Sequence, residues 1–208
     1  MRRILCYGDS NTWGFVPSSD RDRYPVSIRY PRVLASLLGD EYEVIEEGLP
    51  GRTVLLDDEV INVGNRNGSL VFGQIVYSHL PLDYVLILLG SNDLKPPVKG
   101  RVKQCVDALE NIYLDMINKK LGGRMKGIPK VIIVAPSIVG SGGIMDEDTI
   151  EESKLFNKKY EELAKRNNCL FVSNDGLVTG SDDIHLTVES HKLLARKIYE
   201  MIKEYESR

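Results

Sequence analysis

Cysteine is scarce in this sequence, and its pattern argues against a disulfide framework. The chain has three cysteines among 208 residues, Cys6, Cys105 and Cys169, an odd number scattered through apolar surroundings. Small secreted domains with disulfide frameworks carry an even number of cysteines at regular spacings. Reduced thiols in a cytoplasmic protein are therefore expected here. A cysteine nucleophile is also disfavoured, because Cys6 lies in a predicted strand and no histidine is near the other two in sequence.

Long apolar runs and an excess of positive charge are absent as well. No run approaches the roughly 18–20 apolar residues that a membrane-spanning helix needs. The apolar stretch behind the basic start ends at Gly8, too early for the core of a signal peptide. The net formal charge is −3 at pH 7. Nucleic-acid-binding domains carry a basic excess, so neither nucleic acid nor a membrane is an expected partner.

Signatures of metal and nucleotide sites are missing too. The three histidines, His79, His185 and His191, are not paired at metal-ligand spacing, and no cysteine–histidine cluster occurs. Gly8 and Gly14 are too far apart for G-x-S-x-G or G-x-G-x-x-G, and no Lys-Ser or Lys-Thr pair follows them. No metal site and no cofactor are therefore predicted.

What the sequence does contain is the pattern of an α/β domain. Its length, with 42% hydrophobic and 27% charged residues, fits one globular domain over residues 1–208. Strand candidates are the apolar runs Ile4–Tyr7, Tyr42–Ile45, Tyr84–Leu89, Val131–Ala135 and Leu170–Val172. Because amphipathic segments separate these runs, a five-stranded parallel sheet with helices on both faces is expected.

The helices are expected where apolar residues recur every three or four positions. The candidates are Val26–Leu38, Gly68–Leu80, Val98–Lys120, Asp148–Asn167 and Val188–Tyr205. Pro31 has to lie in the first turn of its helix or kink it. Asn67 is the expected N-cap of the second helix. No repeat or linker interrupts the alternation of strands and helices.

Polar residues with chemical potential follow four of the predicted strands. Ser10 comes directly after the first strand, Gly51 after the second, Asn92 after the third, and Asp182 and His185 after the fifth. In an open α/β sheet, ligands bind outside the carboxyl ends of the strands. These residues are therefore expected to meet at one edge. Each taken alone also fits an ordinary loop.

Together they match the requirements of acyl transfer. A serine becomes a nucleophile when an adjacent imidazole removes its proton and a carboxylate orients that imidazole. Ser10 and His185 are the candidates. Asp182, three residues before His185, is expected on the same side of the chain, and Asp175 is the rival acid. Asn92 is either a donor to the oxyanion of the tetrahedral intermediate or an ordinary turn residue.

The remaining histidines and two aromatic residues have alternative explanations. His79 ends a helix, where capping accounts for it. His191 falls in the middle of the last helix and is expected on the surface or in helix packing. Trp13 and Phe15 either wall the acyl or alcohol pocket or pack the turn onto the first helix. His185 is therefore the preferred base.

Four short blocks together resemble the SGNH hydrolases, also called the GDSL esterase/lipase family. The blocks are Gly8-Asp9-Ser10, Gly51 in its glycine-rich turn, Gly90-Ser91-Asn92-Asp93 and Asp182-Asp183-Ile184-His185. Asn11 stands where many members have leucine, a variant expected to leave the chemistry untouched. The resemblance implies a flavodoxin-like three-layer α/β/α sandwich. It also implies an oxyanion hole made by the Ser10 and Gly51 amides and the Asn92 side chain.

Within this family, the sequence around Trp13 and the run His79-Leu80-Pro81-Leu82-Asp83 resemble the arylesterase/acyltransferase branch. The resemblance implies a serine ester hydrolase for small carboxylic esters, with an acyl-enzyme on Ser10 and acyl transfer as a second outcome. Thioesters, lysophospholipids and acetylated sugars stay open as substrates, as does a non-catalytic carbohydrate- or partner-binding protein. Branch members are often homo-oligomers, so Leu55–Asn67 either narrows a neighbour's pocket or is a plain surface excursion.

Overall fold

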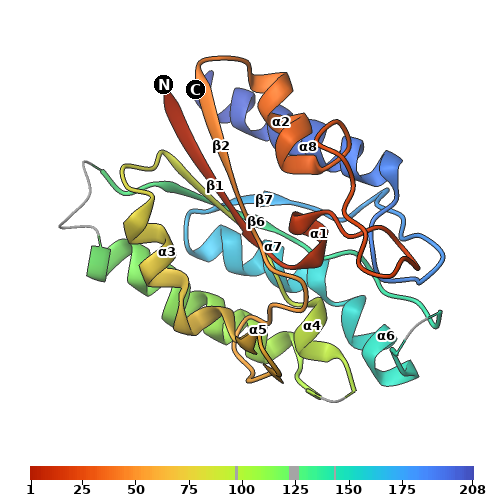
Figure 1. The fold of residues 1–208 in the computed structure, drawn as a ribbon. Coiled ribbons are helices and arrows are strands. Elements are labelled where there is room, and N and C mark those ends of the chain that lie inside the picture. Colours follow the sequence, from red (N-terminus) through yellow and green to blue (C-terminus); the bar gives the residue numbers. More distant parts are fainter. Residues whose placement is uncertain (97, 122–126, 143) are drawn as a thin grey trace.

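The centre of the protein is a five-stranded sheet in which all neighbouring strands are parallel (Figure 1). A computed structural model describes residues 1–96, 98–121, 127–142 and 144–208. In spatial order the strands are β2 (Tyr42–Gly48), β1 (Arg2–Gly8), β5 (Tyr84–Leu88), β6 (Lys130–Val134) and β7 (Leu170–Val172). The five strands predicted from the apolar runs and their parallel pairing are confirmed.

Both faces of the sheet are buried, which is why its strands read as nearly continuous apolar runs. In β1, Ile4 and Cys6 belong to one core and Leu5 and Tyr7 to the other, as the alternation of side chains along a strand requires. The face with Ile4 and Cys6 is covered by α2 (Tyr30–Leu38) and α8 (Val188–Glu206) (Figure 1). The opposite face is covered by α3 (Phe72–Ser78), α5 (Val102–Ala108) and α7 (Phe156–Arg166). The result is the expected three-layer α/β/α sandwich.

The helices lie where they were predicted, but several boundaries differ. α2 begins at Tyr30 rather than Val26, and Pro31 lies in its first turn. The second predicted helix is divided into a 3₁₀ turn, η1 (Gly68–Leu70), and α3. Asn67 caps that turn with its side chain, as predicted. Among the described residues, none of the helices combines the length and hydrophobicity that a bilayer crossing needs.

Two long predicted helices are interrupted. The third begins at Val102 rather than Val98, because Lys99 has a φ of 53° that no right-handed helix accommodates. It continues beyond α5 as the π-helical segments η2 (Leu109–Leu114) and η3 (Met116–Leu121). The fourth is divided into α6 (Glu147–Ser153) and α7. The apolar rhythm runs through this second break, so periodicity alone could not show it.

Small elements at the carboxyl edge of the sheet were not predicted. α1 (Ser10–Trp13) and α4 (Ser91–Leu94) are single helical turns that follow β1 and β5. A hairpin of β3 (Glu59–Val60) and β4 (Gly64–Asn65) lies within the segment of residues 55–67. α1 and α4 are important for the site, because they set the direction of the polar side chains that follow each strand.

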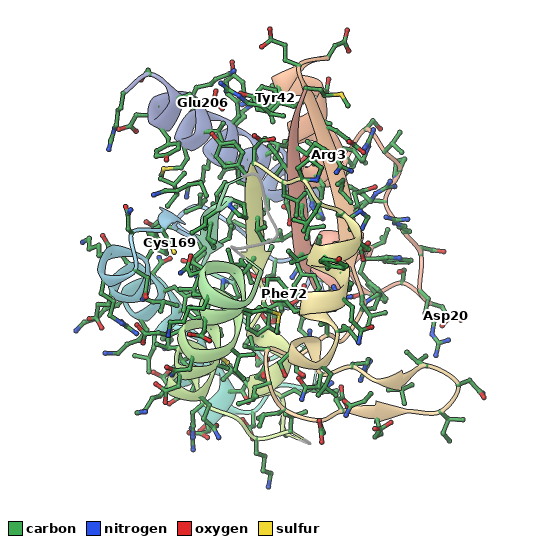
Figure 2. All side chains as sticks on the ribbon, turned by 90° about the vertical axis from the view of Figure 1, so that its left-hand side faces the viewer. Arg3, Asp20, Tyr42, Phe72, Cys169 and Glu206 are labelled. Carbon is green, nitrogen blue, oxygen red and sulfur yellow. The ribbon has the colours of Figure 1, made fainter. Side chains whose placement is uncertain are left out.

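The amino edge of the sheet is closed by the end of the last helix. Both chain ends lie on this side of the molecule (Figure 1), where Glu206 in α8 forms an ion pair with Arg2 in β1. The hydroxyls of Tyr42 and Tyr84 donate to the same carboxylate at 2.7 and 2.8 Å. Figure 2 shows Tyr42 and Glu206 next to each other at this edge.

Candidate active site

Three side chains from opposite ends of the sequence meet where β1 ends. Nε2 of His185 lies 3.0 Å from Oγ of Ser10, and Nδ1 of His185 lies 2.7 Å from Oδ2 of Asp182. Both distances are those of hydrogen bonds. The structure thus connects a carboxylate, an imidazole and a hydroxyl by two successive hydrogen bonds. The acid is Asp182, which the three-residue spacing favoured.

A tight turn presents Ser10 at the end of β1. Gly8 leaves no room for a side chain, since a Cβ there would lie 2.0 Å from Oγ1 of Thr12. Asp9 caps α1 by accepting a hydrogen bond from the Asn11 backbone N–H at 2.9 Å. Ser10 is therefore the first residue of a short helix whose start is fixed on both sides.

Hydrogen bonds on all sides hold Asp182 as a carboxylate. Oδ1 accepts from the backbone N–H groups of Ile184 and His185 at 3.0 and 2.9 Å, and Oδ2 accepts from that of Ser18 at 3.0 Å. Burial disfavours the charge of Asp182, but the bonds from His185, Ile184 and Ser18 outweigh it, so its pKa lies below the usual value. An ionised carboxylate fixes the proton on Nδ1 of His185, which leaves Nε2 free to accept the proton of Ser10.

The other acids near this loop have different partners. Oδ1 of Asp175, the rival acid, accepts from Asn157 Nδ2 at 2.9 Å. Oδ2 of Asp183, the neighbour of Asp182, accepts from the Gly142 backbone N–H at 2.8 Å. Among the contacts of the described residues, neither acid bonds a histidine.

Asn92, in α4, lies beside the turn that carries the nucleophile candidate. Its Nδ2 donates to the backbone oxygen of Arg52 at 3.2 Å and to Oδ2 of Asp9 at 3.4 Å. Both contacts are at or beyond the long end of the range for amide donors. The side chain is partly exposed, so an incoming oxyanion could replace either of these weak acceptors.

Gly51 lies in the turn after β2, which is tied to the end of β1. The carbonyl of Gly8 accepts from the backbone N–H of Leu49 at 3.1 Å and from Nη1 of Arg52 at 2.9 Å. Gly51 has a φ of 81°, and a Cβ there would lie 2.1 Å from the Arg66 guanidinium. The positive φ therefore favours glycine here, whereas the Arg66 guanidinium is the end of a flexible side chain.

Two buried aspartates support these loops from beneath. Asp93 accepts from the backbone N–H groups of Val54 and Leu55 at 2.7 and 3.1 Å, while Asp9 holds the start of α1. Burial raises the pKa of Asp9 to about 7 and that of Asp93 to about 6, although hydrogen bonds from backbone N–H groups oppose the shift in both. The edge that carries the site therefore contains carboxyls that resist ionisation.

Trp13 and Phe15 occupy different places around the imidazole. The ring of Phe15 stacks on that of His185, with centroids 4.3 Å apart and an interplanar angle of 22°. Trp13 lies beside Phe15, with ring centroids 6.1 Å apart, and the guanidinium of Arg23 lies 5.1 Å from its centroid. Phe15 thus contacts the candidate base directly, a role that the sequence did not indicate.

The other two histidines have structural surroundings. His191 lies in the first turn of α8 and not in its middle, as had been expected. It is fully buried, so the surface alternative is wrong and the helix-packing one is confirmed. Its Nδ1 accepts from the Tyr30 backbone N–H at 3.3 Å, and burial lowers its pKa to about 4. His79 ends α3 as expected, and its Nε2 lies 2.9 Å from Oε1 of Glu47. Within the described ranges, no group of three or more His, Cys, Asp or Glu side chains is arranged to hold a metal ion.

Asn11 has a contact that was not expected from the sequence. Its Oδ1 accepts a hydrogen bond of 2.9 Å from the backbone N–H of Leu186, the residue after the candidate base. The two residues are 175 positions apart, and no local pattern connects them. Only the folded arrangement could have shown this bond.

Residues 6–193 of the chain match the GDSL-like Lipase/Acylhydrolase family model. The chain belongs to this family. It is a GDSL-type carboxylic ester hydrolase, as the four blocks indicated. Known esterases of the same fold support this conclusion, whereas a comparison with curated proteins gives no match.

Similar solved structures include esterases that cover nearly all of this GDSL hydrolase. A carbohydrate acetylesterase from Sinorhizobium meliloti is 33% identical and covers 99% of this chain and 100% of its own, with a TM-score of 0.89. The native aryl esterase of M. smegmatis is 29% identical and covers 98% of this chain and 99% of its own, with a TM-score of 0.89. The similarity therefore extends over the full fold, including the edge at which the site lies.

Proposed function

We propose that this GDSL hydrolase cleaves small carboxylic esters through an acyl-enzyme on Ser10. The observation that carries the proposal is the continuous contact from Asp182 through His185 to Ser10, at 2.7 and 3.0 Å. Nucleophile, base and orienting acid are already within reach of one another, so little rearrangement is needed before the chemical step.

In the acylation step, Oγ of Ser10 attacks the ester carbonyl carbon while Nε2 of His185 takes the hydroxyl proton. Asp182 stabilises the imidazolium that forms. The oxyanion accepts hydrogen bonds from the backbone amides of Ser10 and Gly51 and from the side chain of Asn92. The imidazolium then returns its proton to the leaving alcohol oxygen as the carbon–oxygen bond breaks.

In the second step, His185 activates a water molecule that hydrolyses the acyl group from Ser10. An alcohol that takes the place of this water would receive the acyl group instead, which is acyl transfer. Phe15 supports the imidazole from one side, since an aromatic face stabilises a neighbouring cation. Trp13, next to Phe15, forms the outer wall of the same region.

Acetylated sugars are a second candidate substrate class. A relative that covers this chain almost completely is described as a carbohydrate acetylesterase, and another as an aryl esterase. Both descriptions share ester hydrolysis and differ in the alcohol. The acyl mechanism at Ser10 is the same for both, so the alcohol side of the pocket decides between them.

The test compares initial rates on p-nitrophenyl acetate, butyrate, octanoate and palmitate, with acetate release from an acetylated monosaccharide measured in parallel. We expect the rates to fall with increasing acyl length. Ser10→Ala should lower them by about 10⁴-fold or more. Ser137→Ala is the matched control, because Ser137 is a buried serine that follows β6 at the same edge, and it should keep the wild-type rate. Turnover that survives Ser10→Ala in the folded protein would overturn the proposal.

A further inference from the structure

Two consecutive residues of α1 bond two consecutive residues of the loop that carries the base. Ser10 contacts the ring of His185 at 3.0 Å, and the Asn11 carboxamide accepts from the Leu186 backbone N–H at 2.9 Å. One bond alone would fix a distance. Two adjacent bonds also fix how the loop is turned toward the helix.

We propose that Asn11 is a positioning residue for ester hydrolysis. Its side-chain oxygen anchors the backbone next to His185 and thereby keeps the imidazole within reach of Ser10. This inference rests on the proposed roles of Ser10 and His185, and it adds a residue that touches neither substrate nor reacting atoms.

Asn11 is well suited to hold the loop because it is itself held. Its backbone N–H donates to Oδ1 of Asp9 at 2.9 Å, and only 5% of the residue is exposed. Leu186, whose N–H it accepts, is 1% exposed. If an apolar side chain of similar size fills the place of the carboxamide, the buried N–H of Leu186 is left without an acceptor.

Two further backbone bonds at the base lie within its own segment. The carbonyl of His185 accepts from the Gly180 N–H at 2.7 Å, and Thr187 N–H donates to Val178 at 3.1 Å. These bonds fix the shape of the segment but not its place relative to α1. The bond from Asn11 crosses between the two elements and is buried. Other bonds tie the same loop to neighbouring segments, from the Ser18 N–H to Asp182 at 3.0 Å and from the Gly140 N–H to the Asp183 carbonyl at 2.8 Å. The Asn11 bond joins α1 itself to the residue next to His185.

A shift of the loop should be costly for catalysis and not for binding. Misplacing a catalytic group by about 1 Å can cost about a hundredfold in rate. Substrate affinity depends on other surfaces. Loss of the Asn11 carboxamide is therefore expected to lower kcat and to leave KM nearly unchanged.

The main variant is Asn11→Leu, which has a similar size but no acceptor. We expect kcat for p-nitrophenyl acetate to fall about 10- to 100-fold, with KM within about twofold of wild type. The matched control is Thr12→Val, which removes another buried hydrogen bond of α1, the one between the hydroxyls of Thr12 and Tyr30 at 2.9 Å. This control should lower the melting temperature without lowering kcat. A kcat for Asn11→Leu within twofold of wild type would overturn the proposal.

A double-mutant cycle with His185→Ala separates positioning from a general structural effect. If Asn11 acts through the imidazole, Asn11→Leu should change the residual rate of His185→Ala by less than about twofold. An equal fold-loss in both backgrounds would show that Asn11 does not act through His185. Asn11→Ala, which adds no bulk, replaces the leucine variant if circular dichroism shows that the latter is unfolded.

Failure of the proposed function gives a different result. In that case Ser10→Ala and His185→Ala would themselves keep the wild-type rate. Loss of activity in those two variants together with full activity in Asn11→Leu would overturn the positioning role alone.

Discussion

The two edges of the central sheet both gather polar groups, yet they use them in opposite ways. At the carboxyl edge, the hydroxyl of Ser10 bonds the imidazole of His185, and the amide of Asn92 has weak partners that a substrate can displace. At the amino edge, the carboxylate of Glu206 receives bonds from Tyr42, Tyr84 and Arg2. One edge keeps its groups available for chemistry, and the other uses them to hold the last helix.

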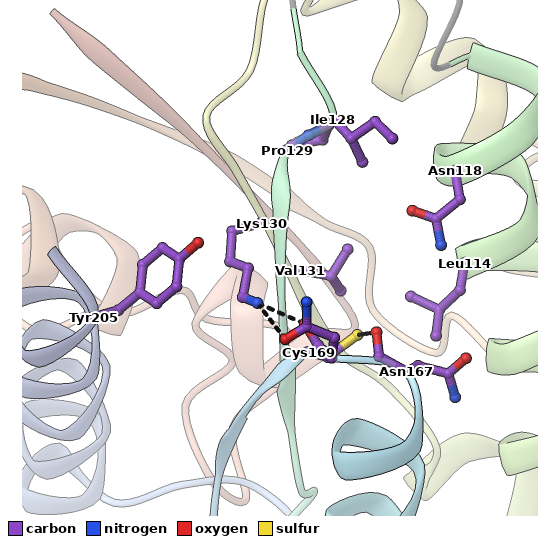
Figure 3. A pocket seen from close by; sticks show the side chains of 10 residues that line it. Leu114, Asn118, Ile128, Pro129, Lys130, Val131, Asn167, Cys169 and Tyr205 are labelled. Atoms are coloured by element: carbon purple, nitrogen blue, oxygen red, sulfur yellow. Dashed lines mark hydrogen bonds between the residues drawn. The ribbon is translucent and has the colours of Figure 1, made fainter. Parts of the chain in front are cut away.

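The amino edge is hollowed even though it lacks the triad. A hollow of about 340 Å³ lies at the amino edge, beside the starts of β6 and β7 (Figure 3). Its polar groups bond one another, as Lys130 Nζ does with the backbone oxygen of Asn168 at 2.6 Å. Cys169 contributes a thiol to the lining of this hollow, but burial raises the pKa of that thiol to about 11. A serine in contact with a base therefore identifies the site better than volume does.

The carboxyl groups differ in the same way. Burial raises the pKa of Asp9 to about 7 at the carboxyl edge. Burial also acts on Glu206, but hydrogen bonds from Tyr42, Tyr84 and Arg2 outweigh it and lower the pKa of that carboxyl. Ionised Glu206 thus stabilises the fold, as Asp182 does at the carboxyl edge, whereas the charge of Asp9 would destabilise it.

Replacing one carboxylate at each edge gives the largest contrast. Asp182→Asn should lower kcat by about 10³- to 10⁴-fold, because the amide favours the wrong tautomer of His185. Glu206→Gln should leave kcat unchanged and lower the melting temperature. Steady-state rates and thermal unfolding of the purified variants measure both effects.

Asp175→Asn is the control for this contrast at the same edge. Asp175 bonds Asn157 and not the imidazole, so its variant should keep the wild-type rate. A crippled Asp175→Asn beside a silent Asp182→Asn would reverse the assignment of the acid.

Removal of the oxyanion donor should have the next largest effect. Asn92→Ala is expected to lower kcat by about 10²- to 10³-fold, as for other donors of this kind. KM should change little, because the interaction strengthens as the oxyanion forms. A normal kcat with a raised KM would show that Asn92 binds substrate and does not stabilise the transition state.

The pH dependence of the rate sharpens the comparison further. Turnover should fall on acidification between pH 8 and 5, since a protonated imidazole cannot accept the proton of Ser10. Asp182 stays ionised throughout this range because its pKa is lowered. A decline of kcat/KM toward acid pH is therefore expected, and a flat profile would argue against His185 as the base.

The smallest expected effect is on stability. The folded protein keeps the Asp9 proton up to about pH 7, whereas an unfolded aspartate releases it near pH 3.9. Between these values the folded state binds more protons, so the contribution of Asp9 to stability falls as pH rises. His191, with a pKa lowered to about 4, acts in the opposite direction, so the variant must be compared with wild type.

We compare how the free energy of unfolding changes from pH 5 to pH 8 in Asp9→Asn and in wild type. This change should favour the folded state by about 1–3 kcal/mol more in Asp9→Asn than in wild type. Urea unfolding at the two pH values measures this difference. Equal changes in the two proteins would show that Asp9 is already ionised in the fold at pH 5.

Local patterns in the sequence were sufficient for much of the fold. Apolar runs marked all five strands, and the three-residue spacing marked Asp182 as the neighbour of His185. They were insufficient where a distant contact or a single dihedral angle decides the outcome. The positive φ of Lys99 shortens one helix, and the apolar rhythm hides the break between α6 and α7. Phe15 and Asn11 act on a loop that lies far away in sequence, which no window of neighbouring residues can reveal.

The separation of 175 positions between Ser10 and His185 has a consequence for synthesis on the ribosome. At about 5–20 residues per second, the nucleophile is made on the order of ten seconds or more before its base. Until α8 has emerged and packed beside α2, Ser10 is an ordinary alcohol without a proton acceptor. A nascent chain therefore has no activated serine, and the onset of hydrolysis indicates that the last helix has folded.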